Sequence, residues 1–189
     1  MNVIHGDIKA ENILLTAGPD SNVGALVAKI ADFGLSSKLE SSAQKENGVG
    51  RKIGRGTAEY MSPELSGECG ERRLGVDVWA CGVLLYVLLS GQYPFHGSTP
   101  DETRKHVVDG RVVFPSATFA HVSSQAIELV RKLLTRDPVQ RPSAQEALND
   151  PWFESNGIRS SSSISASGAS PRSATNALTR GLNILHHRR

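Results

Sequence analysis

Residues 78–89 read VWACGVLLYVLL, an apolar run of 12 residues. A helix that spans a bilayer needs about 20 apolar residues, so this run is too short to cross a membrane. It predicts instead a buried helix over about 76–90 that ends at Gly91. Such a helix must be surrounded by other apolar surface. A chain of 189 residues that is 39% hydrophobic is long enough to provide that surface within one domain.

Three further segments carry the signals of helices. Residues 98–110 begin with Ser and Thr caps, have acids in the first turn and end at a glycine. Residues 143–153 open with a capping box, in which Ser143 is followed by Glu146 three residues later. Residues 123–135 place apolar side chains on one helical face. That face comprises Ala126, Ile127, Val130, Leu133 and Leu134.

Two short strands are expected near the start of the chain. Residues 12–15 (NILL) and 25–31 (ALVAKIA) are apolar, and the polar stretch between them contains Gly and Pro, as hairpin loops do. Residues 36–55 are polar, charged and rich in glycine, which indicates a long mobile loop. The helical segments follow this loop.

The charged residues are unevenly distributed. The formal net charge is +2, but residues 155–189 contain five Arg and no acid, so residues 1–154 carry a net charge of −3. A main body close to neutrality gives no reason to expect nucleic-acid binding. Residues 155–175 are rich in serine and predict a disordered linker. Residues 176–189 combine leucines at helical spacing with basic residues, a pattern that a calmodulin-binding or autoinhibitory segment would have. A solvated, frayed end is the favoured interpretation, because Gly181 would lie in the middle of the helix.

The cysteines and the first residues bear on location. Cys69 and Cys81 have neither the spacing of a metal site nor that of a disulfide framework. The first residues lack the basic and apolar regions of a signal peptide. Together these features predict a cytoplasmic location, with a nuclear one also open, and no membrane partner.

Four polar residues suited to phosphoryl transfer occur early in the chain. This reaction needs a carboxylate to orient and deprotonate a hydroxyl, and cations to offset the phosphate charge. Asp7 can be that carboxylate, and Lys9 can place its ammonium group on the phosphoryl group. Asn12 and Asp32 lie at the ends of the two predicted strands and offer the hard oxygen ligands that Mg²⁺ prefers. Each residue alone is a weak signal, but H-x-D-x-K-x-x-N followed 20 residues later by D-F-G is specific.

These motifs and three more downstream resemble the protein kinase family, in the family's order, from residue 3 to about 154. The matching stretches are HGDIKAEN (5–12), DFGLS (32–36), GTAEYMSPE (56–64), DVWACG (77–82) and RDPVQRPSAQEALNDPWF (136–153). The resemblance implies a mainly α fold, namely the helical C-terminal lobe of a kinase domain with a short β-hairpin and without the N-terminal lobe. It divides the chain into this partial domain (1–154), the linker (155–175) and the basic tail (176–189).

The resemblance also assigns roles to single residues. Asp7 would be the catalytic base, and Lys9 the cation that stabilises the transferred phosphate. Thr57 would bond to both and tie the substrate platform to the catalytic loop. ATP and Mg²⁺ are the implied cofactors, with Asn12 and Asp32 as the metal ligands. The residues expected to act in catalysis are Asp7, Lys9, Asn12 and Thr57, and those expected at the cofactor are Lys9, Glu11, Asn12, Leu14 and Asp32.

A second set of residues would hold the architecture. Asp77 would accept backbone N–H groups of the catalytic loop, and Glu64 would form a buried ion pair with Arg141. Ser62 stands where the family usually has Ala before Pro-Glu. The residues with an implied structural role are His5, Phe33, Gly34, Glu64, Asp77 and Arg141.

Residues 82–115 resemble the calcium/calmodulin-dependent and calcium-dependent group of Ser/Thr kinases. In that group, Leu35 after the D-F-G motif implies a preference for Ser over Thr in the protein substrate. Residues 20–25 (DSNVGA) have acidic-type ligand spacing but lack the Gly and Glu that a Ca²⁺ loop requires. Calcium binding by this chain is therefore not expected.

Gly6 departs from the family, which normally has Arg at this position. That Arg pairs with a phosphorylated residue of the activation loop, so Gly6 predicts that phosphorylation within 36–57 is not the on-switch. Small-molecule phosphotransferases of the aminoglycoside and choline kinase kind share H-G-D-x-x-x-x-N and remain an alternative. They usually lack the Lys two residues after the Asp, so Lys9 and the later motifs favour a protein kinase.

The family's Gly-rich lid, strand Lys and helix Glu precede the catalytic loop, and none is found in this sequence. The chain is therefore expected to be a truncated kinase fragment that phosphorylates substrates inefficiently by itself, because part of the preorganised site is absent. A non-catalytic kinase-lobe module that binds a partner is the second alternative.

Overall fold

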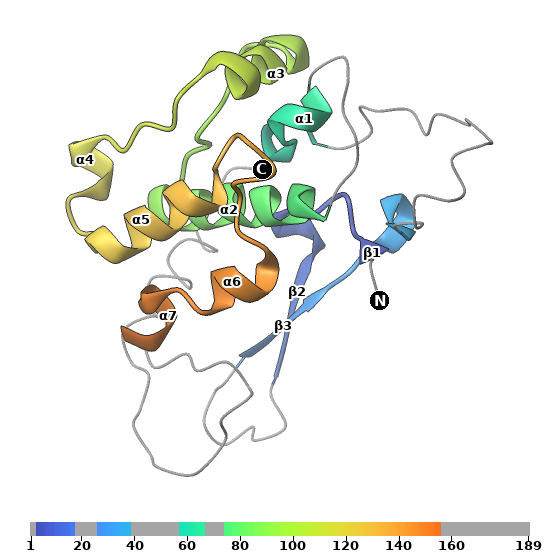
Figure 1. The fold of residues 1–189 in the computed structure, drawn as a ribbon, viewed down its shortest axis with the longest axis horizontal. Coiled ribbons are helices and arrows are strands. Elements are labelled where there is room, and N and C mark those ends of the chain that lie inside the picture. Colours follow the sequence, from blue (N-terminus) through green and yellow to red (C-terminus); the bar gives the residue numbers. More distant parts are fainter. Residues whose placement is uncertain (1–2, 18–25, 39–56, 67–73, 156–189) are drawn as a thin grey trace.

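The structure, a computed structural model, describes residues 3–17, 26–38, 57–66 and 74–155. Helices make up most of the ordered secondary structure, and Figure 1 shows them gathered around α2, with one long hairpin extending away. The helices are α1 (Pro63–Ser66), α2 (Gly75–Ser90), α3 (Pro100–Asp109), α4 (Ser116–Phe119), α5 (Ser124–Leu133), α6 (Ala144–Leu148) and α7 (Pro151–Ser155). The strands are β1 (Val3–Ile4), β2 (Ile13–Ala17), β3 (Leu26–Ile30) and β4 (Ser37–Lys38), and the 3₁₀ turns are η1 (Ala10–Asn12), η3 (Phe33–Leu35) and η5 (Ala58–Tyr60).

Several predictions concern residues outside these ranges. They are the absence of a calcium loop at 20–25, most of the mobile loop at 36–55, the serine-rich linker and the basic tail. The tail's calmodulin-binding or autoinhibitory role and the cytoplasmic location stay predictions.

The apolar run forms the central helix, as predicted, and α2 starts one residue earlier than expected. It ends at Gly91, which has a left-handed φ of 70° and donates its N–H to the Val87 carbonyl at 2.7 Å. Trp79 and Val83 are fully buried, because neighbouring helices cover this helix from several sides. Figure 1 shows α5 running beside α2, with α1 and α3 above them.

Two apolar clusters form the core. The larger one joins α2 to the 5–12 loop, to η5, to the loop after α2, and to α3, α4 and α5. Its buried members are Ile8, Tyr60, Trp79, Ala80, Val83, Tyr86, Val87, Phe95, Val107, Phe119, Val130 and Leu134. In the smaller cluster, Trp152 and Phe153 of α7 are partly buried against Val78, Leu129 and Leu133.

The β2–β3 hairpin is confirmed. Its strands are antiparallel, with Ile13 opposite Ile30 and Ala17 opposite Leu26. Most of its side chains are exposed, including Leu14 at 53%. A second antiparallel pair, β1 with β4, was not predicted, because strands of two residues leave no alternating pattern in the sequence.

Helices α3, α5 and α6 each begin directly after a capping residue. The α3 N-cap is Thr99 and the α5 N-cap is Ser123, each accepting a backbone N–H from three residues later. The capping box of Ser143 and Glu146 is present, but residues 143–153 form two helices because Pro151 starts α7. Of the residues expected on the buried face of α5, Ile127 is only partly buried. Leu129, which was not among them, is buried at 1% exposure. None of the helices in the described ranges has the length and apolar character to cross a membrane.

Candidate active site

The loop over residues 5–12 connects β1 to β2 and is held by the central helix. Asp77, in the first turn of α2, accepts the backbone N–H of His5 at 2.8 Å and that of Gly6 at 2.9 Å. Gly6 has a φ of 79°, in the left-handed region that residues with a Cβ adopt at a cost. A buried helix thus fixes the backbone just before Asp7.

His5 links this loop to the segment after β3. Its Nδ1 lies 3.3 Å from the backbone N–H of Asp7, and its Nε2 lies 3.1 Å from the carbonyl of Ala31. A backbone N–H can only donate and a carbonyl can only accept, so the contacts require the neutral tautomer with hydrogen on Nε2. The ring of His5 also meets Phe33 edge-on, with centroids 4.8 Å apart.

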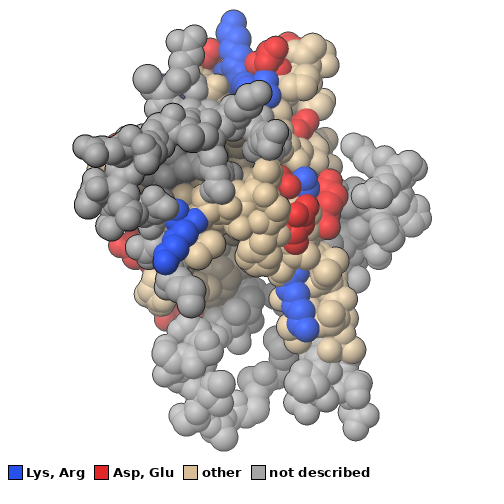
Figure 2. Space-filling view, turned by 90° about the vertical axis from the view of Figure 1, so that its right-hand side faces the viewer, with Lys and Arg blue, Asp and Glu red and all other residues tan. Residues whose placement is uncertain are grey.

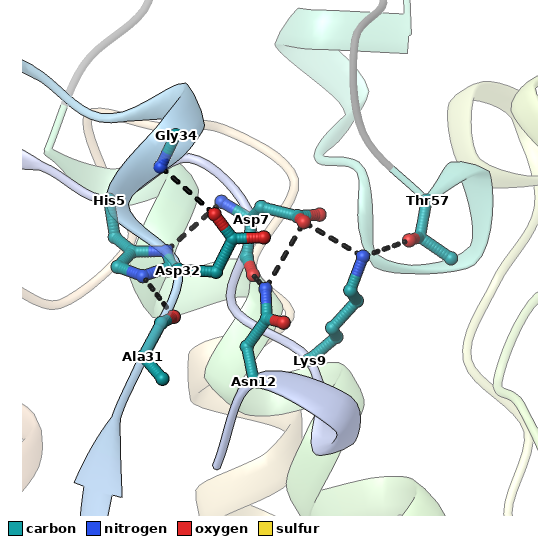
Figure 3. Close-up of polar contacts among 8 residues, drawn as sticks. All are labelled: His5, Asp7, Lys9, Asn12, Ala31, Asp32, Gly34 and Thr57. Carbon is teal, nitrogen blue, oxygen red and sulfur yellow. Dashed lines mark hydrogen bonds and ion pairs between the residues drawn. The ribbon is translucent and has the colours of Figure 1, made fainter.

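Four side chains from two distant segments meet beyond His5 (Figure 3). Lys9 Nζ lies 2.8 Å from Asp7 Oδ2 and donates to Thr57 Oγ1 at 3.1 Å. Asn12 Nδ2 donates to the same Asp7 oxygen at 3.2 Å and to the Asp7 carbonyl at 2.8 Å. The carboxylate is therefore held by an ammonium and an amide, with only 10% of the Asp7 side chain exposed. A carboxylate fixed in this way can accept a proton from a hydroxyl placed beside it.

Asp32 lies close to this cluster, because the N–H of Ala31 donates to the Asn12 carbonyl at 2.8 Å. The backbone of Asp32 is left-handed, with a φ of 62°, and Asp32 Oδ1 accepts the N–H of Gly34 at 3.1 Å. Figure 3 shows its carboxylate on the side of Asp7 and Asn12. Strain of this kind persists at functional sites, where the surroundings enforce it.

The donor atoms fit a magnesium ion. Both Asn12 hydrogen bonds use the amide nitrogen, which leaves the amide oxygen as a ligand, and Asp32 supplies a carboxylate. Mg²⁺ commonly takes one or two such groups from a protein and the remainder from phosphates and water. Within the described part of the chain, no three His, Cys, Asp or Glu side chains converge to form a self-sufficient metal site.

Leu14 and Glu11, which were expected at the cofactor, make none of the polar contacts drawn in Figure 3. Leu14 is exposed on β2. Glu11 is exposed on η1. Burial raises the pKa of the Tyr60 and Tyr93 hydroxyls, and the negative charge of Glu11 is one of the lesser causes that raise it further. In the view of Figure 2, acidic side chains gather beside a basic one near the middle of the face.

Arg141 is placed against Glu64 with none of its side chain exposed. Its two terminal nitrogens lie 2.7 and 2.9 Å from the two Glu64 oxygens. The guanidinium also donates to the carbonyls of Gly75 at 2.8 Å, Thr135 at 2.8 Å and Arg136 at 3.3 Å. Its hydrogen-bonding groups are therefore satisfied without solvent, which is what a buried cation requires.

Four groups at or beside the site were not predicted from the sequence: the Ala31 carbonyl, Glu59, Tyr93 and His96. The carbonyl could not have been found, because a backbone acceptor has no residue signature. Glu59 is only two residues from Thr57 and could have been noted on that ground, whereas nothing in the sequence places Tyr93 and His96 beside it.

Comparisons with known proteins agree with the motifs. A family model described as protein kinase domain matches residues 1–153. The chain is 39% identical over 153 residues to calcium-dependent protein kinase 4 of Plasmodium berghei, covering 80% of this chain and 27% of that protein. It is 40% identical over 154 residues to the calcium and calcium/calmodulin-dependent serine/threonine-protein kinase of Pisum sativum, covering 81% and 27%. It is 39% identical over 166 residues to calcium-dependent protein kinase 9 of Arabidopsis thaliana, covering 87% and 28%. The chain thus spans little more than a quarter of the length of these relatives.

Proposed function

The chain belongs to the protein kinase family, and we propose that it contributes the C-terminal lobe of a serine/threonine kinase that transfers the γ-phosphate of ATP to a protein hydroxyl. One observation carries the proposal: Lys9 Nζ bridges Asp7 Oδ2 and Thr57 Oγ1, at 2.8 and 3.1 Å. This bridge joins the carboxylate that accepts the proton to the segment on which a peptide would lie.

In this proposal each residue acts through the contacts described above. Asp7 orients the substrate hydroxyl and accepts its proton, since Lys9 and Asn12 fix its carboxylate. Lys9 also offsets negative charge on the transferred group. Magnesium-bound ATP, when present, supplies the phosphoryl group, and Asn12 with Asp32 would hold the metal. Leu14 would contact adenine and Glu11 would lie at the edge of the cofactor site.

The proposal is tested by phosphate transfer to a serine peptide. We expect residues 1–189 to transfer phosphate slowly, and Asp7→Asn to lower the rate by about 10²-fold or more, since general base catalysis contributes about 10²–10⁴-fold. Asp109→Asn removes a carboxylate that is exposed at the end of α3 and is the matched control. Equal transfer by Asp7→Asn and the wild-type chain would contradict the assignment of the base.

The alternatives predict different results in the same assay. A small-molecule phosphotransferase would use an aminoglycoside or choline as acceptor and ignore the peptide. A non-catalytic module would show no Asp7-dependent transfer and no stabilisation by Mg²⁺ and ATP. The Lys9–Thr57 contact favours a peptide acceptor, because it ties the catalytic loop to the segment that precedes α1.

Gly6 bears on regulation in the same proposal. A glycine cannot pair with a phosphorylated residue, so phosphorylation within 36–57 would not serve as the on-switch. Stoichiometric phosphorylation of that loop in the full enzyme should leave kcat/KM nearly unchanged. A large gain on phosphorylation would show that another cation replaces the missing Arg.

A further inference from the structure

An imidazole and a carboxylate face each other at the edge of the candidate active site. Glu59 lies on η5, two residues after Thr57, and His96 lies in the loop between α2 and α3. His96 Nδ1 is 3.9 Å from Glu59 Oε1. The His96 side chain is 66% exposed and that of Glu59 is 25% exposed, so both groups can be reached from solvent.

The surroundings hold His96 in this place. Its ring stacks on Tyr93, with centroids 6.3 Å apart and planes inclined by 22°. Tyr93 in turn packs edge-on against the buried Tyr60, with centroids 5.7 Å apart. From α3, His106 Nδ1 lies 2.8 Å from the carbonyl of His96 and anchors the loop.

The charged groups around His96 come from several elements. Glu59 contributes from η5, and Glu11 of η1 lies near enough to affect Tyr93. On α3, His106 contacts the loop, and Glu102 Oε2 accepts the N–H of Ser98 at 2.7 Å, so Glu102 is engaged with the start of its own helix. Glu59 is thus the carboxylate that the structure places against the His96 ring.

We propose that His96 is a specificity-determining residue whose protonation decides whether Glu59 is available to a Lys or Arg side chain of a protein substrate. The inference rests on the proposed function, since Glu59 follows Thr57 on the segment assigned to the substrate. Histidine is the side chain suited to a change of charge between about pH 5 and 8. Protonated His96 pairs with Glu59 and repels a cation, whereas neutral His96 leaves the Glu59 carboxylate available to a cation of the substrate.

Affinity for a substrate that carries a cation is therefore expected to be higher at pH 7.5 than at pH 5.5. Exposed ion pairs contribute about 0.2–1 kcal/mol, because water and salt screen them. The expected change for a peptide that carries Arg is therefore about 1.4- to 5-fold between pH 5.5 and 7.5. A peptide with Gln in place of Arg should show no such change.

The test measures binding of fluorescent serine peptides to residues 1–189 by anisotropy at pH 5.5 and 7.5, without ATP. His96→Gln should bind the Arg peptide at pH 5.5 as tightly as the wild-type chain binds it at pH 7.5. Glu59→Gln should bind it weakly at both values. Thermal melts of both variants confirm that each is folded.

An unchanged pH dependence in His96→Gln, or full affinity in Glu59→Gln, would overturn the inference. Because binding is measured without phosphate transfer, these results are separate from the Asp7→Asn assay. Failure of transfer alone would overturn the proposed function, whereas failure of the pH effect alone would leave it standing.

Discussion

Replacing Gly6 with Ala tests whether the catalytic loop depends on a left-handed backbone. At its φ of 79°, an L-residue is strained by about 1–2 kcal/mol relative to glycine. Alanine also restricts the unfolded chain more than glycine does, which by itself raises the free energy of unfolding by about 0.4–1 kcal/mol. The net expectation is a loss of about 1 kcal/mol in the free energy of unfolding. The N–H that donates to Asp77 is kept, so the loss reports on backbone strain and not on a missing hydrogen bond.

The assay is urea denaturation followed by circular dichroism, with two matched variants. Gly75→Ala makes the same chemical change at the first residue of α2, where an added Cβ would be 3.4 Å from the nearest atom of Arg141. That variant should gain about 0.4–1 kcal/mol, because the helical backbone suits alanine. Gly6→Asn should lose less than Gly6→Ala, since Asn tolerates the left-handed region. If Gly6→Ala is as stable as the wild-type chain, the strain argument is refuted.

Three further predictions concern single side chains. Asp32→Asn should keep its backbone conformation, because Asn tolerates a positive φ, yet lose the stabilisation that Mg²⁺ and ATP give in a thermal-shift assay; undiminished stabilisation would exclude Asp32 as a ligand. Arg141→Ala should lower the free energy of unfolding by about 3–5 kcal/mol, since it leaves a carboxylate without its buried partner, and a loss below about 1 kcal/mol in urea denaturation would contradict this. Ser62→Ala should raise the free energy of unfolding by about 1 kcal/mol, because the buried Ser62 hydroxyl has no hydrogen-bond partner among the described residues; a thermal melt with a lower midpoint would count against it.

Much of the framework follows from local sequence patterns. The central helix was predictable because its apolar run has the wrong length for a membrane and a glycine at its end. The β2–β3 hairpin and the capping box of Ser143 were predictable for similar reasons, since each depends on residues close together in the chain.

Other features depend on contacts that no local pattern encodes. The β1–β4 pair places Val3 opposite Lys38 through backbone pairing, which any two short segments could form. The left-handed backbone of Asp32 depends on neighbours around the loop and not on its own preference. Contact between His96 and Glu59 likewise arises only when the loop after α2 packs against η5.

The bonds of Arg141 also have a consequence for the order of folding. They reach Glu64 and Gly75, which are 77 and 66 residues away in the chain. Closing a chain segment of that length costs about 4 kcal/mol of entropy by the (3/2)RT ln n relation, which is comparable to the whole effect of removing such a pair. The pair can therefore form only after α2 and α5 have packed together. Substitutions at Arg141 should accordingly speed unfolding more than they slow folding.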